Sequence, residues 1–286
     1  MWWALTSAAL AGAPWVRAPG ASYSKLSTQR FATTGFVGQD GAVQEGSPTV
    51  SWATSVYVEV GVLPKVQLAV AAPWVASHSE VAEARFSNHS GGDLLVDLTA
   101  GTEVVPGLPV ALTARTKWPT YDNGALRAYG AAGQRFPAAG DGQVDAELLG
   151  HVGTGLSWGH FRGWWMTETG YRYRSEWWLG DSDPIDRTIG DGLTGRLQLG
   201  WTPTRDAKSL GWVFVEADAI KALQASPTTR EQLQVSAGLA AALQHGLAIE
   251  LGASHLVWTA ASAPGTAWRA GLSWQRSPPA PDMQPE

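Results

Sequence analysis

Residues 55–74 read SVYVEVGVLPKVQLAVAAPW and contain the pattern that decides the fold. After the turn-forming pair at 63–64, every second residue from Val66 to Trp74 is apolar, whereas the positions between them start with Lys65 and Gln67. Successive side chains of a β-strand point to opposite faces, so this alternation predicts a strand with one apolar and one less apolar face. The tight turn before it predicts antiparallel pairing with the preceding strand.

The same period of two recurs along the chain and predicts about twelve strands. Most of them hold about 10 to 15 residues, whereas strands of soluble proteins usually have about 5 or 6 and a tilted membrane-spanning strand needs roughly 9 to 11. The predicted spans are 21–31, 49–62, 65–75, 92–105, 109–118, 143–157, 160–176, 192–202, 211–221, 231–244, 247–258 and 266–275.

The connections between these strands alternate between long and short along most of the chain. The long ones are 32–48, 76–91, 119–142 and 177–191, and the short ones lie at 63–64, 106–107, 158–159 and 245–246. Bacterial outer-membrane barrels have short periplasmic turns and longer extracellular loops. The sequence therefore predicts an all-β protein, a transmembrane antiparallel up-and-down β-barrel of about 12 strands over residues 14–276, in the bacterial outer membrane.

Composition agrees with this class and excludes others. Of 286 residues only 16% are charged, 33 are Gly and 16 are Trp, while Cys is absent. Without cysteine there is no disulfide framework and no zinc–thiolate site. The net charge of −5 argues against a general nucleic-acid binder. A soluble all-β binding protein remains an alternative, although it gives no reason for the alternating connection lengths.

Aromatic residues cluster near the ends of the predicted strands, on the apolar face or in the short turns. Tyr and Trp favour the boundary between membrane and water because one part of each side chain is apolar and another can hydrogen-bond. We predict membrane-interface positions for Trp74, Trp118, Trp158, Phe161, Trp165, Tyr171, Tyr173, Trp201, Trp268 and Trp274.

If the apolar face meets lipid, the other face lines the lumen. Charges are tolerated there, because they pair or meet water. Either they form a paired network that rigidifies the wall, or they line a polar conduit that orients a solute. The lumen-lining candidates are Glu59, Lys65, Asp93, Asp97, Glu103, Arg115, Lys117, Asp145, Glu147, Arg162, Glu168, Arg172, Arg174, Arg196 and Arg269, with Glu216, Asp218 and Glu250 on the same face.

Both ends of the sequence differ from the strand pattern. Residues 1–13 read MWWALTSAALAGA, a short apolar run that ends in small residues resembling a cleavage site. We predict a signal peptide there, or else an apolar N-terminal arm. Residues 277–286 read SPPAPDMQPE, and this proline-rich composition predicts a disordered tail.

One stretch has the residue types of an enzyme. His89 and Ser90 are adjacent in a predicted loop, and some outer-membrane barrels hydrolyse lipids with a Ser/His pair. Neighbouring residues of an extended chain point in opposite directions, however, whereas a nucleophile needs its base within hydrogen-bond reach. The acidic loop at 181–186 matches no calcium-loop spacing. We therefore predict no catalytic residues, no metal and no cofactor.

Several short motifs, in this order, resemble the outer-membrane transporter family linked to the meta-pathway of phenol degradation. They are SYSKL at 22–26, SVYVEVGV at 55–62 followed at once by a tight turn, GDL at 92–94 and Pro119-Thr120 closing a strand. Tyr121 stands where the family often has Gly, and Pro64-Lys65 where it usually has Asp-Arg. The resemblance implies a barrel that passes small, often hydrophobic or aromatic, molecules.

The sequence thus predicts a passive channel or transporter for small molecules, with a plugged, non-conducting barrel of structural or interaction role as the alternative. A lipid-hydrolysing barrel is a further possibility. The partners we expect are outer-membrane lipids, a small-molecule solute and the barrel-assembly machinery, but no nucleic acid. The solute, the pore radius and the oligomeric state stay open.

Overall fold

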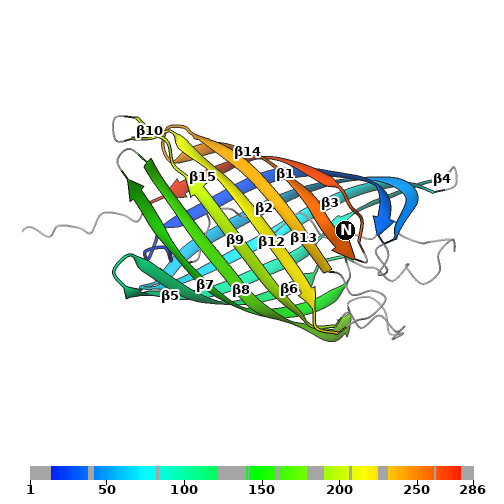
Figure 1. Ribbon diagram of the computed structural model, residues 1–286, viewed down its shortest axis with the longest axis horizontal. Coiled ribbons are helices and arrows are strands. Elements are labelled where there is room, and N and C mark those ends of the chain that lie inside the picture. Colours follow the sequence, from blue (N-terminus) through cyan, green and yellow to red (C-terminus); the bar gives the residue numbers. More distant parts are fainter. Residues whose placement is uncertain are drawn as a thin grey trace, which may run out of the picture.

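One antiparallel sheet closes on itself in the computed structural model, because β1 (Ser22–Val37) pairs with both β2 (Val43–Leu63) and β15 (Thr266–Arg276) (Figure 1). Of the thirteen strands in this sheet, β4 (Ala84–Gly91) pairs only with the outer half of β3 (Val66–Val81), in line with the strand that begins at Asp93, which leaves twelve around the barrel. The structure describes residues 14–37, 42–81, 84–121, 140, 142–158, 161–178, 190–205, 208–224, 231–260 and 262–277.

The wall strands are long and follow one another around the barrel in chain order. They are β1 (Ser22–Val37), β2 (Val43–Leu63), β3 (Val66–Val81), β5 (Asp93–Val105), β6 (Leu108–Pro119), β7 (Gln143–Trp158), β8 (Phe161–Trp178), β9 (Gly192–Trp201), β12 (Gly211–Ala222), β13 (Glu231–Ala242), β14 (Leu247–Ala260) and β15 (Thr266–Arg276). These are the twelve predicted strands, with ends shifted by a few residues.

Side chains alternate between the interior and the outside along each strand. On β2, Ala53, Ser55 and Glu59 are buried, whereas Trp52, Val56 and Val58, at the alternate positions, are exposed. The outside is largely apolar, and its exposed leucines and valines include Leu26, Leu98, Leu112, Leu148, Leu197, Val235 and Leu251. A closed sheet with this exterior satisfies its backbone hydrogen bonds without water, as lipid requires. The predicted transmembrane barrel is confirmed.

Tight turns lie at one end of the barrel, and two of them contain residues with positive φ that are not glycine. Lys65 has φ 67° in the β2–β3 turn, and His245 has φ 59° before Gly246, at 78°, in the β13–β14 turn. Two successive positive φ values are typical of the type I′ hairpin turn, whose twist suits antiparallel strands. The small hairpin of β10 (Thr204–Arg205) and β11 (Lys208–Ser209) lies at this end as well (Figure 1).

The opposite end carries the longer connections, and one of them corrects the sequence prediction. Residues 76–91 were expected to form a loop, but β3 continues to Val81 and pairs with β4, from Trp74 opposite Gly91 to Val81 opposite Ala84. Neither face of this stretch is apolar, so the alternation of apolar and polar residues that predicts a strand is absent from its sequence. A hairpin that projects beyond the membrane needs no such face, because both of its sides can meet water.

Several predictions fall outside the described residues. These are the signal peptide over 1–13, the acidic loop at 181–186 and the tail beyond Ser277. Among the described residues, no helix is long and apolar enough to cross a membrane.

Leu98 tests the assignment of the outer face, because it is 52% exposed at mid-strand and pairs with Leu68, which also faces outward. We expect Leu98→Arg to destabilise the barrel by about 2–4 kcal/mol, the cost of a guanidinium at bilayer mid-depth. Urea unfolding in liposomes measures this change. Leu98→Met is the matched control and should unfold like wild type; equal stability of the Arg variant would contradict the assignment.

Candidate functional site

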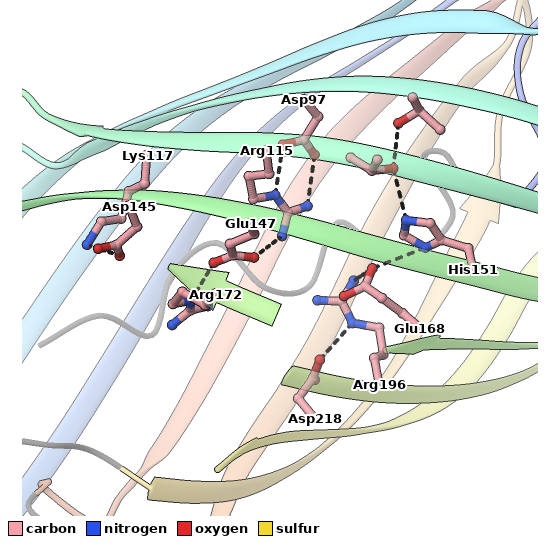
Figure 2. A network of polar contacts seen from close by, with 12 residues as sticks. Asp97, Arg115, Lys117, Asp145, Glu147, His151, Glu168, Arg172, Arg196 and Asp218 are labelled. Atoms are coloured by element: carbon pink, nitrogen blue, oxygen red, sulfur yellow. Dashed lines mark hydrogen bonds and ion pairs between the residues drawn. The ribbon is translucent and has the colours of Figure 1, made fainter. Parts of the chain in front are cut away.

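Charged side chains of alternating sign form a row across the inner wall (Figure 2). Asp97, Arg115, Glu147 and Arg172 are successive cross-strand partners on β5, β6, β7 and β8. Arg115 donates from Nε and Nη2 to the two carboxylate oxygens of Asp97, both at 2.8 Å, and its Nη1 lies 3.7 Å from Glu147 Oε2. Arg172 Nε donates to Glu147 Oε1 at 2.5 Å. The row is a consequence of register, since directly opposed residues share a face.

A second row lies beside it, two residues further along the strands. Asp145 is buried between Lys117, whose Nζ is 2.7 Å from Oδ2, and Arg174, whose Nε donates to Oδ1 at 3.2 Å. One carboxylate thus meets cations from both neighbouring strands.

A third row continues the network toward β12. His151 Nδ1 is 3.3 Å from Glu168 Oε2, and its Nε2 is hydrogen-bonded to the hydroxyl of Thr113 at 2.9 Å. Arg196 Nη1 lies 3.8 Å from Glu168, and Arg196 Nε donates to Asp218 Oδ1 at 2.7 Å (Figure 2). Gln198, next along β9, donates to Glu216 at 2.8 Å.

The wall formed by β1, β2 and β3 differs, because among its described residues it carries many small hydroxyl side chains and no row of charges. Ser27 and Ser55 are hydrogen-bonded at 3.0 Å, and Ser51 and Ser77 at 3.1 Å. Alanines such as Ala53 are buried between them. The interior is therefore asymmetric: rows of paired charges extend over β5–β12, whereas over β1–β3 small hydroxyl and methyl side chains lie beside a few larger ones, among them Tyr23, Lys25 and Glu59.

One buried ion pair joins this wall to β14. The Lys25 ammonium contacts the Glu250 carboxylate, which also accepts a hydrogen bond from the Tyr23 hydroxyl at 2.9 Å. The pair lies beside the β1–β15 seam that closes the barrel, so it contributes to closure.

The segment before β1, residues 14–20, lies inside the barrel and is called here the N-terminal segment. Its Arg17 forms an ion pair with buried Glu59 and lies over the ring of Tyr23, 5.2 Å from the centroid. The backbone N–H of Arg17 donates to Gln67 Oε1 at 3.0 Å. These contacts fix the segment against the inner faces of β1, β2 and β3.

Glycines on the inner faces of three strands make room for this segment. A Cβ on Gly61 of β2 would lie 2.2 Å from the Ala18 carbonyl oxygen, and one on Gly101 of β5 would lie 2.5 Å from Val16 Cγ2. A Cβ on Gly153 of β7 would approach Pro14 Cγ to 3.0 Å. All three positions are near the short-turn end, so the segment crosses the interior at that mouth and narrows it.

Inward-facing aromatic side chains occupy the same end. Trp164 packs with Phe214 and Trp212, and its indole N–H donates to Gln198 Oε1 at 3.3 Å. A Cβ on Gly200 would lie 1.9 Å from the Trp164 ring, so the ring lies flat on the neighbouring strand. Together with the N-terminal segment, these rings fill part of the lumen.

The structure brings most of the predicted lumen residues together and leaves three apart. Lys65, Glu103 and Arg162 are exposed at the short-turn end, away from the network, because each lies beside or within a turn. Asp93 is buried at the other end and accepts a hydrogen bond from Tyr121 at 3.0 Å. The network itself contains Asp97, Arg115, Lys117, Asp145, Glu147, Glu168, Arg172, Arg174 and Arg196, while Glu59 binds the N-terminal segment. Arg269 faces inward and is half-buried. That these residues line a conduit stays a prediction.

The predicted interface aromatics are exposed, apart from half-buried Trp165. Trp158, Phe161, Trp201 and Trp274 lie near the short-turn end, where Phe161 stacks on Trp201 with centroids 6.4 Å apart. Trp74, Trp118, Tyr171, Tyr173 and Trp268 lie toward the opposite end. Their contact with the membrane boundary stays a prediction.

The two residues weighed for catalysis, His89 and Ser90, have side chains on opposite faces of one strand. The His89 ring is exposed on β4 and packs edge-on against His78, with centroids 5.8 Å apart. Ser90 follows it, on the opposite face of the strand. Within the described ranges, no three His, Asp or Glu side chains gather in a way that could hold a metal ion.

Sequence reasoning missed the contributions of Arg17, Tyr23 and Lys25 to the interior. Arg17 precedes the first strand, so no alternation could place it. Tyr23 and Lys25 share one face of the first predicted strand, and that spacing was a usable signal.

Comparisons with known proteins bear on the fold. No protein-family model matches the sequence, and no curated protein matches it significantly. Among solved structures, an outer-membrane channel from Pseudomonas putida F1 is similar, with a TM-score of 0.70 at 10% identity over 93% of this chain and 98% of that one.

Two autotransporter domains are also similar in structure. The β-domain of BrkA from Bordetella has a TM-score of 0.51 at 12% identity, over 90% of this chain and 99% of that one. The translocator domain of NalP from Neisseria meningitidis has a TM-score of 0.50 at 12% identity, over 90% of this chain and 89% of that one. Such likenesses show the fold. Together with the apolar exterior of the closed barrel, they place the protein in the bacterial outer membrane.

Removing Arg115 tests whether the charge rows hold the wall together. Arg115→Met leaves Asp97 and Glu147 without their shared cation, and breaking a buried pair costs about 3–5 kcal/mol. We expect a loss of this size in the free energy of unfolding, measured by urea titration. The control is Arg85→Met, which breaks the exposed Arg85–Glu80 pair and should cost at most about 1 kcal/mol. Equal losses would mean that the rows add nothing.

Proposed function

We propose that the protein is a passive outer-membrane channel for small molecules, with a lumen narrowed at the short-turn end by the N-terminal segment. The observation that carries this proposal is the asymmetric interior. The charged side chains on β5–β12 form ion pairs with one another, so their electric fields largely cancel at the position of a solute. The β1–β3 wall opposite offers small hydroxyl and methyl groups. Transfer of an uncharged molecule from water to a place beside these groups costs little free energy.

The width of the barrel is compatible with passage. Eight strands enclose an interior nearly filled by side chains, and diameter grows roughly linearly with strand number. Twelve strands therefore leave space that paired side chains and the N-terminal segment fill only in part. This favours compact, weakly polar solutes over large hydrophilic ones.

Two further considerations support the proposal. The barrel shares its fold with the Pseudomonas putida outer-membrane channel. The sequence resembles the transporter family of the meta-pathway of phenol degradation, from which we infer a preference for small hydrophobic or aromatic molecules. We infer no enzymatic activity.

The second candidate is a plugged barrel with a structural or interaction role. The close approach of the N-terminal segment to Gly61, Gly101 and Gly153 favours it, since the space between the segment and these strands would not admit even a Cβ. The two candidates differ in whether the segment narrows the lumen or closes it.

Single-channel conductance in a planar bilayer separates them. We expect small, discrete steps from the wild-type protein. A variant lacking residues 14–19 should give larger steps, at least about twofold, because the width set by strand number becomes available. Arg17→Gln combined with Glu59→Gln keeps the chain length and removes the ion pair, so it should lie between the two.

Each outcome decides between the candidates. A silent wild-type protein with a conducting deletion variant would favour the plugged barrel. If wild type and deletion variant conduct equally, the segment does not narrow the lumen. Liposome swelling with neutral aromatic solutes against sugars of similar mass then tests the inferred solute class.

A further inference from the structure

A cation faces outward in the membrane-spanning part of β1. Arg30 is exposed, on the same face as Leu26 and Thr28. Its cross-strand partners are Trp52 on β2 and Trp268 on β15, both exposed. The Arg30 guanidinium lies over the Trp52 ring, 6.0 Å from the centroid. The guanidinium therefore lies over one indole, and a second exposed indole, that of Trp268, is directly across from Arg30 on the other neighbouring strand.

Arg30 lies toward the long-connection end, which is the extracellular side of such barrels. It follows Ser22, at the short-turn end, by eight residues, which in a strand tilted about 45° corresponds to roughly 20 Å of an apolar band about 25 Å tall. Arg30 therefore lies near the outer boundary of the apolar band, just below the outer-leaflet headgroups, where a charge costs far less than at mid-depth.

Arg85 and Lys221, two other exposed cations of the described strands, have carboxylate partners. Arg85 Nε is 2.8 Å from Glu80, and Lys221 Nζ is 2.6 Å from Glu231. No described carboxylate pairs with Arg30. Its charge is therefore available to an anion from the membrane.

An apolar groove begins beside this cation. It has a volume of about 500 Å³ and lies on the outer face across β9, β12, β13, β14 and β15. Small residues, Ala217, Ala237 and Ala253, form its floor, while Leu199 and Trp268 form walls. The groove exists because these alanine side chains are shorter than the side chains on either side of them.

Strand register connects the groove to Arg30. Leu199, Val215, Ala237, Ala253, Trp268 and Arg30 are successive cross-strand partners, so one row runs from the groove to the cation. The strands are tilted from the membrane normal, so a row of cross-strand partners, which runs at right angles to the strands, is tilted from the membrane plane. The groove therefore descends from the level of Arg30 toward mid-membrane, as Leu199 lies near the short-turn end of β9.

A second polar group lies at the upper end of the groove. His255 and Thr266 both line it, and His255 Nδ1 is hydrogen-bonded to Thr266 Oγ1 at 2.9 Å. Thr266 is two residues from Trp268 on the same face, so these groups are one row further outward than Arg30. They offer hydrogen bonds to a sugar or phosphate at the headgroup level.

We propose that this surface binds one lipid of the outer leaflet, a phosphorylated glycolipid of the lipid A type. Its phosphate pairs with Arg30 between Trp52 and Trp268, its sugar lies near His255 and Thr266, and one acyl chain descends in the groove. Charge complementarity, the depth of Arg30 and the oblique course of the groove support this occupant. The site is on the outer face and is independent of any solute in the lumen.

Native mass spectrometry of the full-length protein in detergent tests the site. The probes are bisphosphorylated lipid A, the same lipid A without phosphates, and phosphatidylglycerol. We expect wild type to retain bisphosphorylated lipid A most tightly. Arg30→Gln should weaken that binding by about tenfold, the scale of one charge-assisted contact. Ala237→Phe, which fills the groove and keeps Arg30, should also weaken it.

Arg85→Gln is the matched control, because it removes an exposed arginine at the same end and should leave lipid A binding unchanged. Heat-dependent gel mobility confirms that each variant is a folded barrel. Unchanged binding in Arg30→Gln, or equal binding of lipid A without phosphates or of phosphatidylglycerol, would overturn the proposal. So would a change of oligomeric state in Ala237→Phe with lipid binding intact, since a second copy would then occupy the groove.

Discussion

The structure depends on one constraint, that every backbone N–H and C=O in the membrane must find a partner within the protein. In lipid an unpaired edge strand is too costly, so the sheet has to close. The pairing of β1 with β15, from Ser22 opposite Arg276 to Ala32 opposite Thr266, removes both edges. Closure then divides all strand residues into an outer and an inner set, and the remaining features follow from that division.

The inner set carries most of the charge, and closure determines how it is arranged. Each inward residue has direct partners on both neighbouring strands, so a carboxylate can meet two cations without leaving its strand. Asp145 between Lys117 and Arg174 is one example, and Glu147 between Arg115 and Arg172 is another. Such rows brace the wall over β5–β12. The β1–β3 wall lacks such rows among its described residues, which is why we propose it as the face that a solute meets.

The two ends of the barrel differ from its middle in the side chains and segments that they contain. At the short-turn end, glycines on β2, β5 and β7 admit the N-terminal segment, and Trp164 and Phe214 fill further space. At the other end, the strands continue past the apolar band, and β3 and β4 form a hairpin with polar faces. The lumen is thus restricted on one side, while the outer surface near Arg30 offers a cation and a groove to the surrounding lipid.

The sequence by itself determined the barrel, because alternation, strand length and connection length are all local properties. The stretch from Val66 to Trp74 already separates the two faces, and twelve such stretches give the strand number. Only the tertiary structure decided which charges pair, since register across strands distant in sequence joins Lys25 to Glu250 and Arg196 to Asp218. It also decided that the residues before Ser22 enter the lumen. An irregular segment has no period, and its place depends on glycines of three separate strands that meet only when the barrel closes.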